Sequence, residues 1–477
     1  MHSPAPLRRA WHGLAALLAL APAPSLPAAE SGEGPRPTPV TRPAMKRLLE
    51  DMKARPERIP LPEPSAEEIA AAGDDAQALS YENRLRALFL PATELRGYLG
   101  FGGSAPRRPG APAPKVVIEP DPAVTLDYGF KTRLFWIASR ANNCQYCLGH
   151  QESKLLAVGM TDDDLARLDA DWSGFPEREQ AAFAFARKLS LAPGSVSDAD
   201  VAACLAHYSP KEVLEMALSV GGNNAINRWK EGIGVPQSPS GGNSGWAQAR
   251  PDGSHSYLTP TADRFAATAS AVAVLGGGAL GEGLVATGLP AAPARHDEIR
   301  AALAAARARS PRLPLVDEAE ARTILGAAAG ADGPVPGWMR LLAWFPVAGP
   351  RMARAFLLSA EAPGIDPTDR ALLRWTVARR NRAWYALSLA EADLRRAGFD
   401  DARLADLAGD QATLDDARRA VLVVADTLAA SPVACTDAQF RRALEATSPA
   451  TMTRVVHEVA MESLLDRFTE AAGLPAE

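Results

Sequence analysis

The sequence predicts an all-α protein, and three observations support this prediction. Alanine is abundant while aromatic residues make up only 6% of the chain, a composition that favours helices over sheets. Apolar residues recur at helical spacing, as in Leu134, Ile137 and Ala141, and typical capping residues precede several such segments. The alternation of apolar and polar residues that is typical of half-buried strands is absent from the sequence.

Residues 1–29 have the pattern of a secretory signal peptide. Arg8 and Arg9 form the charged start, residues 11–21 form an apolar run, and residues 26–29 provide small side chains for cleavage. The run is shorter than the ~20 residues of a membrane-spanning helix. We therefore expect export, to the periplasm, and a retained membrane anchor is the alternative. Exported proteins meet oxidising compartments, in which exposed cysteine pairs tend to form disulfides.

Length, charge and cysteine content narrow the class further. With 477 residues the chain is too long for one core, so we expect two domains and their connections. The net charge is −5 and both signs are interspersed, which gives no electrostatic argument for a nucleic acid partner. The 4 cysteines are too few for disulfides to stabilise a chain of this size, so its stability must come from packing.

An internal repeat organises the chain. Residues 136–168 resemble residues 375–407, and Gly398 lies 239 residues after Gly159. One constant shift over this length is hard to obtain by chance. The same shift relates further pairs: Trp136 and Trp375, Arg140 and Arg379, Asn142 and Asn381, Tyr146 and Tyr385, Pro193 and Pro432, Asp198 and Asp437, Ser209 and Ser448, Arg228 and Arg467, and Pro236 and Pro475.

The repeat defines the expected domains. After an N-terminal extension over residues 30–59, we assign residues 60–236 to the first copy and residues 313–477 to the second. Residues 88–91 resemble residues 343–346 at a shift of 255, so the first copy carries an insertion of 16 residues (255 − 239). The Gly/Pro-rich stretch Gly100 to Pro114 fits such a loop.

Residues 237–312 should hold a linker and connecting helices. Gln237 to Gly253 is rich in Gly, Ser and Pro, which is typical of a flexible linker. Phe265 to Leu289 is apolar but contains three consecutive glycines and Glu282, which disfavour a membrane span. We expect a packed connecting helix there.

Within the first copy the helix boundaries are readable. Asn142-Asn143 ends one helix, and the next runs from Cys144 to Val158, where Gly159 supplies the stop. Thr161 and the acidic residues after it begin another helix. Further amphipathic helices are expected over residues 177–189 and 209–227.

Cys144-Gln145-Tyr146-Cys147 is the motif with the clearest chemistry. Two cysteines in the first turn of a helix lie close enough for a disulfide, and the helix dipole stabilises a thiolate there. His150 follows Cys147 by three residues, about 60° away around the helix. An imidazole there can exchange a proton with a thiol or leaving group. Cys144, Cys147 and His150 are therefore the predicted catalytic residues.

Other interpretations of this motif stay open. A zinc site would use Cys144, Cys147 and His150, but the sequence has no second CxxC. Covalent haem attachment requires a histidine where Leu148 stands, so the sequence argues against it. A purely structural disulfide is the main alternative. We predict no metal and no cofactor, and we expect Cys204 and Cys435 to be inert.

The segments ASRANNCQYCLGHQ and SPKEVLEMALSVGGNNAINRW are similar to the carboxymuconolactone decarboxylase and AhpD-like alkylhydroperoxidase superfamily. The resemblance covers both copies, from about residue 60 to 236 and from 313 to 475. It implies two tandem all-helical AhpD-like domains and assembly through helical faces, since members commonly form trimers or hexamers. Members with CxxC act as thiol-dependent peroxidases with peroxiredoxin-like chemistry or as disulfide reductases.

The resemblance also implies roles for single residues. Cys147 would attack a peroxide and become a sulfenic acid, and Cys144 would resolve it to a disulfide. Two positions depart from the family: Gln151 stands where its histidine is usual, and Thr132 where its glutamate is usual. Peroxidase activity and simple disulfide exchange thus both stay open, with a small peroxide or disulfide as substrate. The sequence does not identify the electron donor.

The second copy lacks the cysteine pair. The shift of 239 places Ala383, Ala386 and Leu389 opposite Cys144, Cys147 and His150. We predict that this copy is chemically silent and supplies a partner surface in place of a second subunit.

For the function of the whole chain, a non-catalytic scaffold and a decarboxylase-like enzyme are the remaining alternatives to a thiol oxidoreductase.

Overall fold

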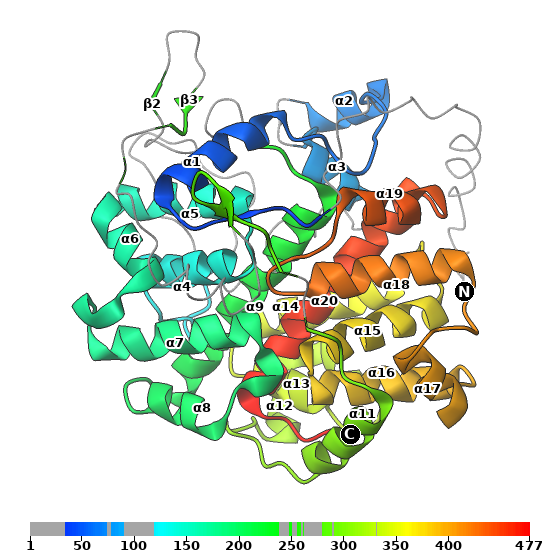
Figure 1. Ribbon diagram of the computed structural model, residues 1–477. Helices are drawn as coiled ribbons and strands as arrows, with labels where there is room; N and C mark the ends of the chain where they lie inside the picture. The colour runs from blue at the N-terminus through cyan, green and yellow to red at the C-terminus, as the bar shows by residue number, and fades with distance from the viewer. Residues whose placement is uncertain are drawn as a thin grey trace, which may run out of the picture. The chain divides into compact units, whose positions relative to one another are not determined.

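The computed structural model describes residues 34–73, 78–89, 119–237, 248–249, 255–258, 261, 279–288, 291–330 and 332–477. Helices dominate these residues, which confirms the all-α prediction (Figure 1). Residues 34–477 form one compact unit. The predicted signal peptide, the insertion over residues 100–114 and most of the predicted linker lie outside the described residues.

Nine α-helices and three 3-10 helices are described before residue 237. They are α1 (Arg42–Asp51), η1 (Met52–Ala54), α2 (Ala66–Ala72), α3 (Tyr81–Ala87), α4 (Tyr128–Ala141), α5 (Gln145–Ala157), α6 (Asp162–Ala170), η3 (Trp172–Gly174), α7 (Glu177–Leu191), η4 (Pro193–Ser195), α8 (Asp198–Leu205) and α9 (Pro210–Ile233).

The described helices after residue 290 are α11 (His296–Arg307), α12 (Glu318–Leu325), η5 (Gly326–Ala329), α13 (Gly337–Leu342), α14 (Ala348–Glu361), α15 (Pro367–Asn381), α16 (Trp384–Arg396), α17 (Asp401–Ala408), α18 (Asp416–Ala429), α19 (Asp437–Glu445) and α20 (Pro449–Ala472). None of the described helices is both long and apolar enough to span a bilayer.

Short strands correct one prediction. The connecting helix expected over Phe265 to Leu289 is wrong at its C-terminal end, where β4 (Ala279–Gly281) and β5 (Leu284–Val285) form a hairpin; residues 265–278 lie outside the described residues. Glu282 and Gly283 both have positive φ, 52° and 76°, and such a turn reverses an antiparallel pair.

The hairpin joins a small sheet. Strand β5 also pairs with β1 (Thr38–Pro39), in the order β1-β5-β4, while β2 (Gln248–Ala249) pairs with β3 (His255–Ser256). Residues near the start of the described chain are therefore held against the segment that connects its two halves.

Six helices recur at the spacing found in the sequence. Tyr128 and Pro367 begin α4 and α15, 239 residues apart, and the same interval separates the bounds of α9 from those of α20. The helices between them follow in the same order. We call α4–α9 the first repeat and α15–α20 the second repeat. Their assignment as two AhpD-like domains stays a prediction.

Local sequence explains where the longest helices begin and end. Ser209 caps α9 in a reciprocal capping box with Glu212, and Pro210 occupies the first turn, where a missing N–H costs nothing. Gly234 ends the helix in the left-handed conformation, with φ of 73°. In the second repeat, the Ser448 side chain accepts from the Thr451 N–H at the start of α20, and Gly473 ends the helix with φ of 62°.

Helices α9 and α20 share the most extensive helix–helix contact in the described structure (Figure 1). Both helices are buried on nearly all sides, which explains why neither sequence has a continuous polar face. Gly232 permits the close approach, because a Cβ atom there would lie 2.5 Å from Val456 Cγ1. The two repeats thus share a core along these helices.

Contacts between the repeats are reciprocal. Arg228 Nη2 donates to the carbonyl of Ala429, and Arg467 Nη2 donates to that of Ser190, both at 3.0 Å. Arg467 lies 239 residues after Arg228, and Ser190 lies 239 residues before Ala429. The two hydrogen bonds are therefore the same contact with the repeats exchanged. Such exchange is the signature of an approximately two-fold interface.

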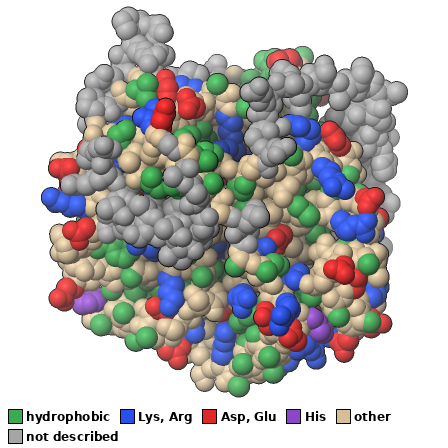
Figure 2. All heavy atoms as spheres, viewed as in Figure 1, with side chains coloured by type: hydrophobic (Ala, Val, Ile, Leu, Met, Phe, Trp, Pro, Cys, Tyr) green, Lys and Arg blue, Asp and Glu red, His purple; other side chains and the backbone are tan. Residues whose placement is uncertain are grey.

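The segments that precede the repeats extend this pattern. Arg58 Nε lies 2.7 Å from the Asp437 carboxylate of the second repeat, and Arg312 Nε lies 2.6 Å from Asp198 of the first. Figure 2 shows acidic and basic side chains interspersed on one face of the molecule.

Candidate functional site

The turn between α4 and α5 positions the cysteine pair. Helix α4 ends at Ala141, and Asn143 adopts a left-handed conformation with φ of 56°, which asparagine tolerates better than most residues. Cys144 is then the N-cap of α5 and Cys147 lies in its first turn. The helix break predicted at Asn142-Asn143 is therefore confirmed.

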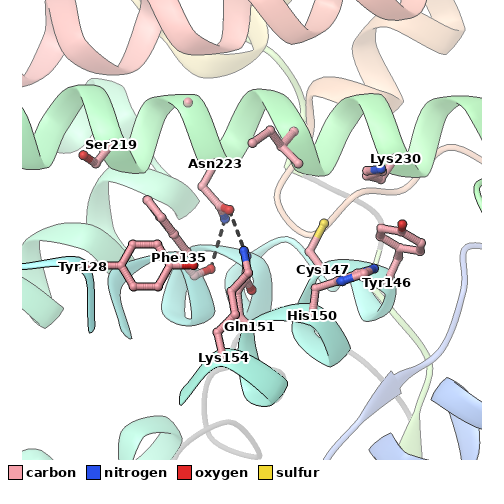
Figure 3. Close-up of a pocket in the computed structure, with 12 residues that line it drawn as sticks. Tyr128, Phe135, Tyr146, Cys147, His150, Gln151, Lys154, Ser219, Asn223 and Lys230 are labelled. Atoms are coloured by element: carbon pink, nitrogen blue, oxygen red, sulfur yellow. Dashed lines mark hydrogen bonds between the residues drawn. The ribbon is translucent and has the colours of Figure 1, made fainter. Parts of the chain in front are cut away.

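Cys147 lines a cavity of about 290 Å³ between α4, α5 and α9 (Figure 3). Its side chain projects from α5 toward α9. The cavity brings together residues of three helices: Tyr128, Phe135, Tyr146, Cys147, His150, Gln151, Lys154, Ser219, Gly222, Asn223, Ile226 and Lys230. Of the three predicted catalytic residues, Cys147 and His150 line this cavity.

Cys144 lies behind Cys147 and is 0% exposed. Burial raises the pKa of the Cys144 thiol well above its usual value, and the neighbouring Cys147 sulfur and the Glu231 carboxylate raise it further. Cys144 therefore stays protonated at neutral pH, while Cys147 is the sulfur that faces the cavity.

Glu231 is held as a carboxylate next to Cys144. Burial by itself would raise the pKa of Glu231, but Arg36, Arg55 and Arg58 outweigh burial, and a hydrogen bond from Cys144 helps to lower the pKa. Arg36 Nη1 and Arg55 Nη2 lie 3.0 and 3.2 Å from the Glu231 carboxylate. The carboxylate thus accepts a hydrogen bond from the Cys144 thiol.

The cavity side of the pair carries positive charge. Lys154 and Lys230 line it, and no acidic residue is among its described lining residues. Lys230 Nζ lies 4.5 Å from the centre of the Tyr146 ring and pairs with Glu82. Burial acts to lower the pKa of Lys230, but Glu82 outweighs it and raises the pKa. Of the two ammonium groups, that of Lys230 is thus already paired within the protein.

His150 is neutral and packs against Tyr146. Their ring centroids are 4.6 Å apart, and Figure 3 shows the imidazole extending toward Tyr146. Burial lowers the pKa of His150 to about 4, helped by Lys230 and Lys154. Its buried Nε2 has no hydrogen-bond partner among the described residues.

The two positions that depart from the family provide no acid or base. The Thr132 hydroxyl donates to the carbonyl of Tyr128 at 2.8 Å. The Gln151 amide lies 2.9 Å from Asn223 Oδ1 (Figure 3). Both side chains are neutral and already bonded within the protein.

Sequence reasoning missed the contribution of α9 to this cavity. Ser219, Asn223, Ile226 and Lys230 line it from that helix, at the i, i+4, i+7, i+11 spacing of one helical face. That spacing was readable in the sequence. It did not single out these residues because α9 carries polar side chains on several faces.

Two residues of the family-like segment lie elsewhere. Asn227 accepts a hydrogen bond from Asn142 at 2.8 Å, and Arg228 bonds to the second repeat. Neither is among the residues that line the cavity. They hold the two repeats and the α4–α5 turn together.

The two remaining cysteines are buried away from this cavity. Burial raises the pKa of Cys204 to about 12, and burial also raises that of Cys435. Both thiols thus have low reactivity. The described residues contain no group of three His, Cys, Asp or Glu that could hold a metal ion.

In the second repeat, Ala383 is the N-cap of α16 and Ala386 is buried in its first turn. The turn before them repeats the left-handed conformation of Asn143 at Arg382, with φ of 53°. The backbone is thus retained without the sulfur atoms.

In comparisons with known proteins, no protein-family model and no curated sequence matches this chain.

Proposed function

We propose that this chain is an exported thiol-dependent oxidoreductase of the AhpD-like alkylhydroperoxidase type. The observation that supports this proposal is the asymmetry of the cysteine pair. Cys147 faces a cavity with two lysines, while Cys144 is buried behind it as a thiol beside the Glu231 carboxylate. This is the arrangement that an attacking and a resolving cysteine require.

In the peroxidase reaction the Cys147 thiolate attacks the terminal oxygen of a peroxide. The S–O bond forms as the O–O bond breaks, so sulfur loses two electrons and the leaving alkoxide takes a proton to become an alcohol. Cys144 then attacks the sulfenic sulfur of Cys147, and its thiol proton goes to the leaving hydroxide. Water leaves and a disulfide remains, which an external dithiol reduces.

Disulfide exchange is the second candidate, and Thr132 and Gln151 favour it. Both stand at the positions of the family's proton relay but carry no titratable group. Disulfide exchange depends less on proton transfer at the site than peroxide reduction does. Cys147 would attack an external disulfide to release one thiol, and Cys144 would displace the second thiol from the mixed disulfide.

Cysteine variants of the full chain test both candidates. We expect Cys147→Ser to reduce peroxide consumption at least 100-fold and Cys144→Ser to form a Cys147 sulfenic acid that dimedone traps. Cys204→Ser is the matched control and should retain activity. An unchanged peroxide rate in Cys147→Ser would remove the proposed nucleophile.

The same variants with an aryl disulfide as substrate separate peroxidase from exchange. Release of thiol without peroxide consumption would favour exchange. A pair that resists reduction below about −300 mV would instead indicate a structural disulfide.

A further inference from the structure

The second repeat contains its own cavity at the equivalent place. It measures about 410 Å³ and lies between α14, α15, α16 and α20. Leu389 lines it where His150 lines the first cavity, and Glu462 lines it where Asn223 does, each pair 239 residues apart. The loss of the cysteines thus did not close this cavity.

The charge of the second cavity differs from that of the first. Lys154 is replaced by Asp393, Ser219 by Glu458 and Asn223 by Glu462 at the shift of 239. These changes bring carboxylates into a place where the first cavity has two lysines and no acidic lining residue.

The arginines of the second cavity already have acidic partners. Arg374 lies 3.0 Å from Glu462 and 3.1 Å from Asp393. Arg370 lies 3.6 Å from Glu458, and Arg396 pairs with Asp393. Each of these arginines thus has a carboxylate within 4 Å, while the buried Nε of Arg370 makes no hydrogen bond among the described residues.

Glu462 has one carboxylate oxygen to spare. The side chain is 4% exposed, its Oε2 accepts from Arg374, and its Oε1 is buried with no hydrogen-bond partner among the described residues. A buried acceptor without a partner is costly, so a donor from a bound molecule would relieve it. Burial raises the pKa of Glu462 despite Arg374, and Glu458 and Asp393 add to the rise.

Apart from Ser359, Ser388 and Glu477, the remaining lining residues of the cavity are apolar. Trp338 and Phe356 meet edge to face at 5.1 Å, and Leu389, Met461 and Leu465 complete the surface. Charged groups and apolar side chains thus line one cavity, and its volume suits a small molecule.

We propose that the second cavity binds a small organic cation, an ammonium group carried by an apolar chain or ring. The ammonium N–H donates to Glu462 Oε1, and the apolar part packs against Phe356, Leu389 and Leu465. The proposal is independent of the cysteine chemistry, because it uses residues of the second repeat and α14 alone.

Three probes of equal length test the chemistry on the full chain: hexylamine, 1-hexanol and hexanoate, followed by calorimetry and saturation-transfer NMR. We expect saturable binding of hexylamine and at least tenfold weaker binding of the other two. Equal binding of hexanol, or tighter binding of hexanoate, would overturn the proposal.

Variants locate the binding. Glu462→Gln should weaken hexylamine binding at least tenfold, while Glu470→Gln, a buried glutamate on the same helix that does not line the cavity, should leave it unchanged. Ala392 lies exposed on α16 and lines the cavity, so Ala392→Phe should block access even if Glu462→Gln fails to fold. Unchanged hexylamine binding in Ala392→Phe or in a folded Glu462→Gln would refute the assignment. Cys147→Ser should bind hexylamine as the unaltered chain does, which keeps this test separate from that of the oxidoreductase.

Discussion

Two cysteines of one helical turn have different surroundings. Cys144 is buried against Glu231, and burial keeps its pKa far above neutral, whereas Cys147 meets a cavity lined by Lys154 and Lys230. The difference comes from α9, which presents Glu231 on one side of the pair and Lys230 on the other. The order of attack in the proposed reaction depends on this difference.

Alkylation kinetics check the difference directly. With iodoacetamide at neutral pH, we expect Cys147 to react at least tenfold faster than Cys144, because only Cys147 faces a space that the reagent can reach. Peptide mass spectrometry gives both rates, and Cys204 serves as a buried control. Faster modification of Cys144 would contradict the assignment of the resolving cysteine.

His150 should make stability depend on pH. Its folded pKa is about 4, below the ordinary value of about 6.5, so the unfolded chain binds more protons between these values. Its contribution to stability is therefore complete above about pH 6.5 and is lost as pH falls toward 4, by up to about 3 kcal/mol.

Urea unfolding of the unaltered chain and of His150→Gln between pH 4.5 and 7.5 measures this contribution. The difference in unfolding free energy between the two proteins should change with pH in favour of the variant as the solution becomes acidic. A difference that is independent of pH would show that the imidazole titrates normally in the folded protein.

At the scale of elements, the contact between α9 and α20 depends on small residues. Gly232 faces Val456, and a Cβ at this position would lie within 2.5 Å of one methyl group and 2.9 Å of the other. Both contacts are shorter than carbon atoms tolerate, so the Val456 side chain or one of the helices must shift when a side chain is added.

We expect Gly232→Val to destabilise the protein by about 2–3 kcal/mol, because overpacking strains a core that two helices share. Thermal and urea unfolding provide the measurement. Gly174→Ala is the matched control, since no atom lies within 4 Å of an added Cβ there. If both variants unfold alike, α9 and α20 do not pack as closely as described.

At the scale of the whole molecule, the repeats contact each other as two subunits of a symmetric dimer do. Arg228 of the first repeat and Arg467 of the second each donate to an equivalent carbonyl of the other repeat. Likewise, Arg58 pairs with Asp437 and Arg312 pairs with Asp198. A covalent partner is always present at high effective concentration, so the chain does not depend on subunit association to bury α9.

A fragment of residues 34–236 tests this dependence. Without the second repeat, the fragment would expose the face of α9 that packs on α20, so we expect it to self-associate at micromolar concentration. Light scattering coupled to size-exclusion chromatography measures the mass, with the chain from residue 34 to 477 as control. A stable, folded monomer would contradict the shared core.

Short-range interactions determined what could be predicted from the sequence. Helix starts at Thr161 and Ser209 follow from side chains that bond to backbone N–H groups three residues on, and such bonds need no tertiary context. The spacing of 239 residues, the turn at Asn142-Asn143 and the cysteine pair at a helix start were readable for the same reason. The connecting helix expected over Phe265 to Leu289 was wrong at 279–288, because pairing with β1, far away in sequence, decides that conformation.

Only the tertiary structure decided which side chains meet. Glu231 and Lys230 are adjacent in sequence, yet Glu231 contacts the buried Cys144 while Lys230 lines the Cys147 cavity. The packing of α9 against α5 determines this difference. Likewise, the charge of the second cavity depends on carboxylates from α16 and α20 that helix packing brings together. Local propensity determines helices, whereas the electrostatics of a site depends on distances between elements that are remote along the chain.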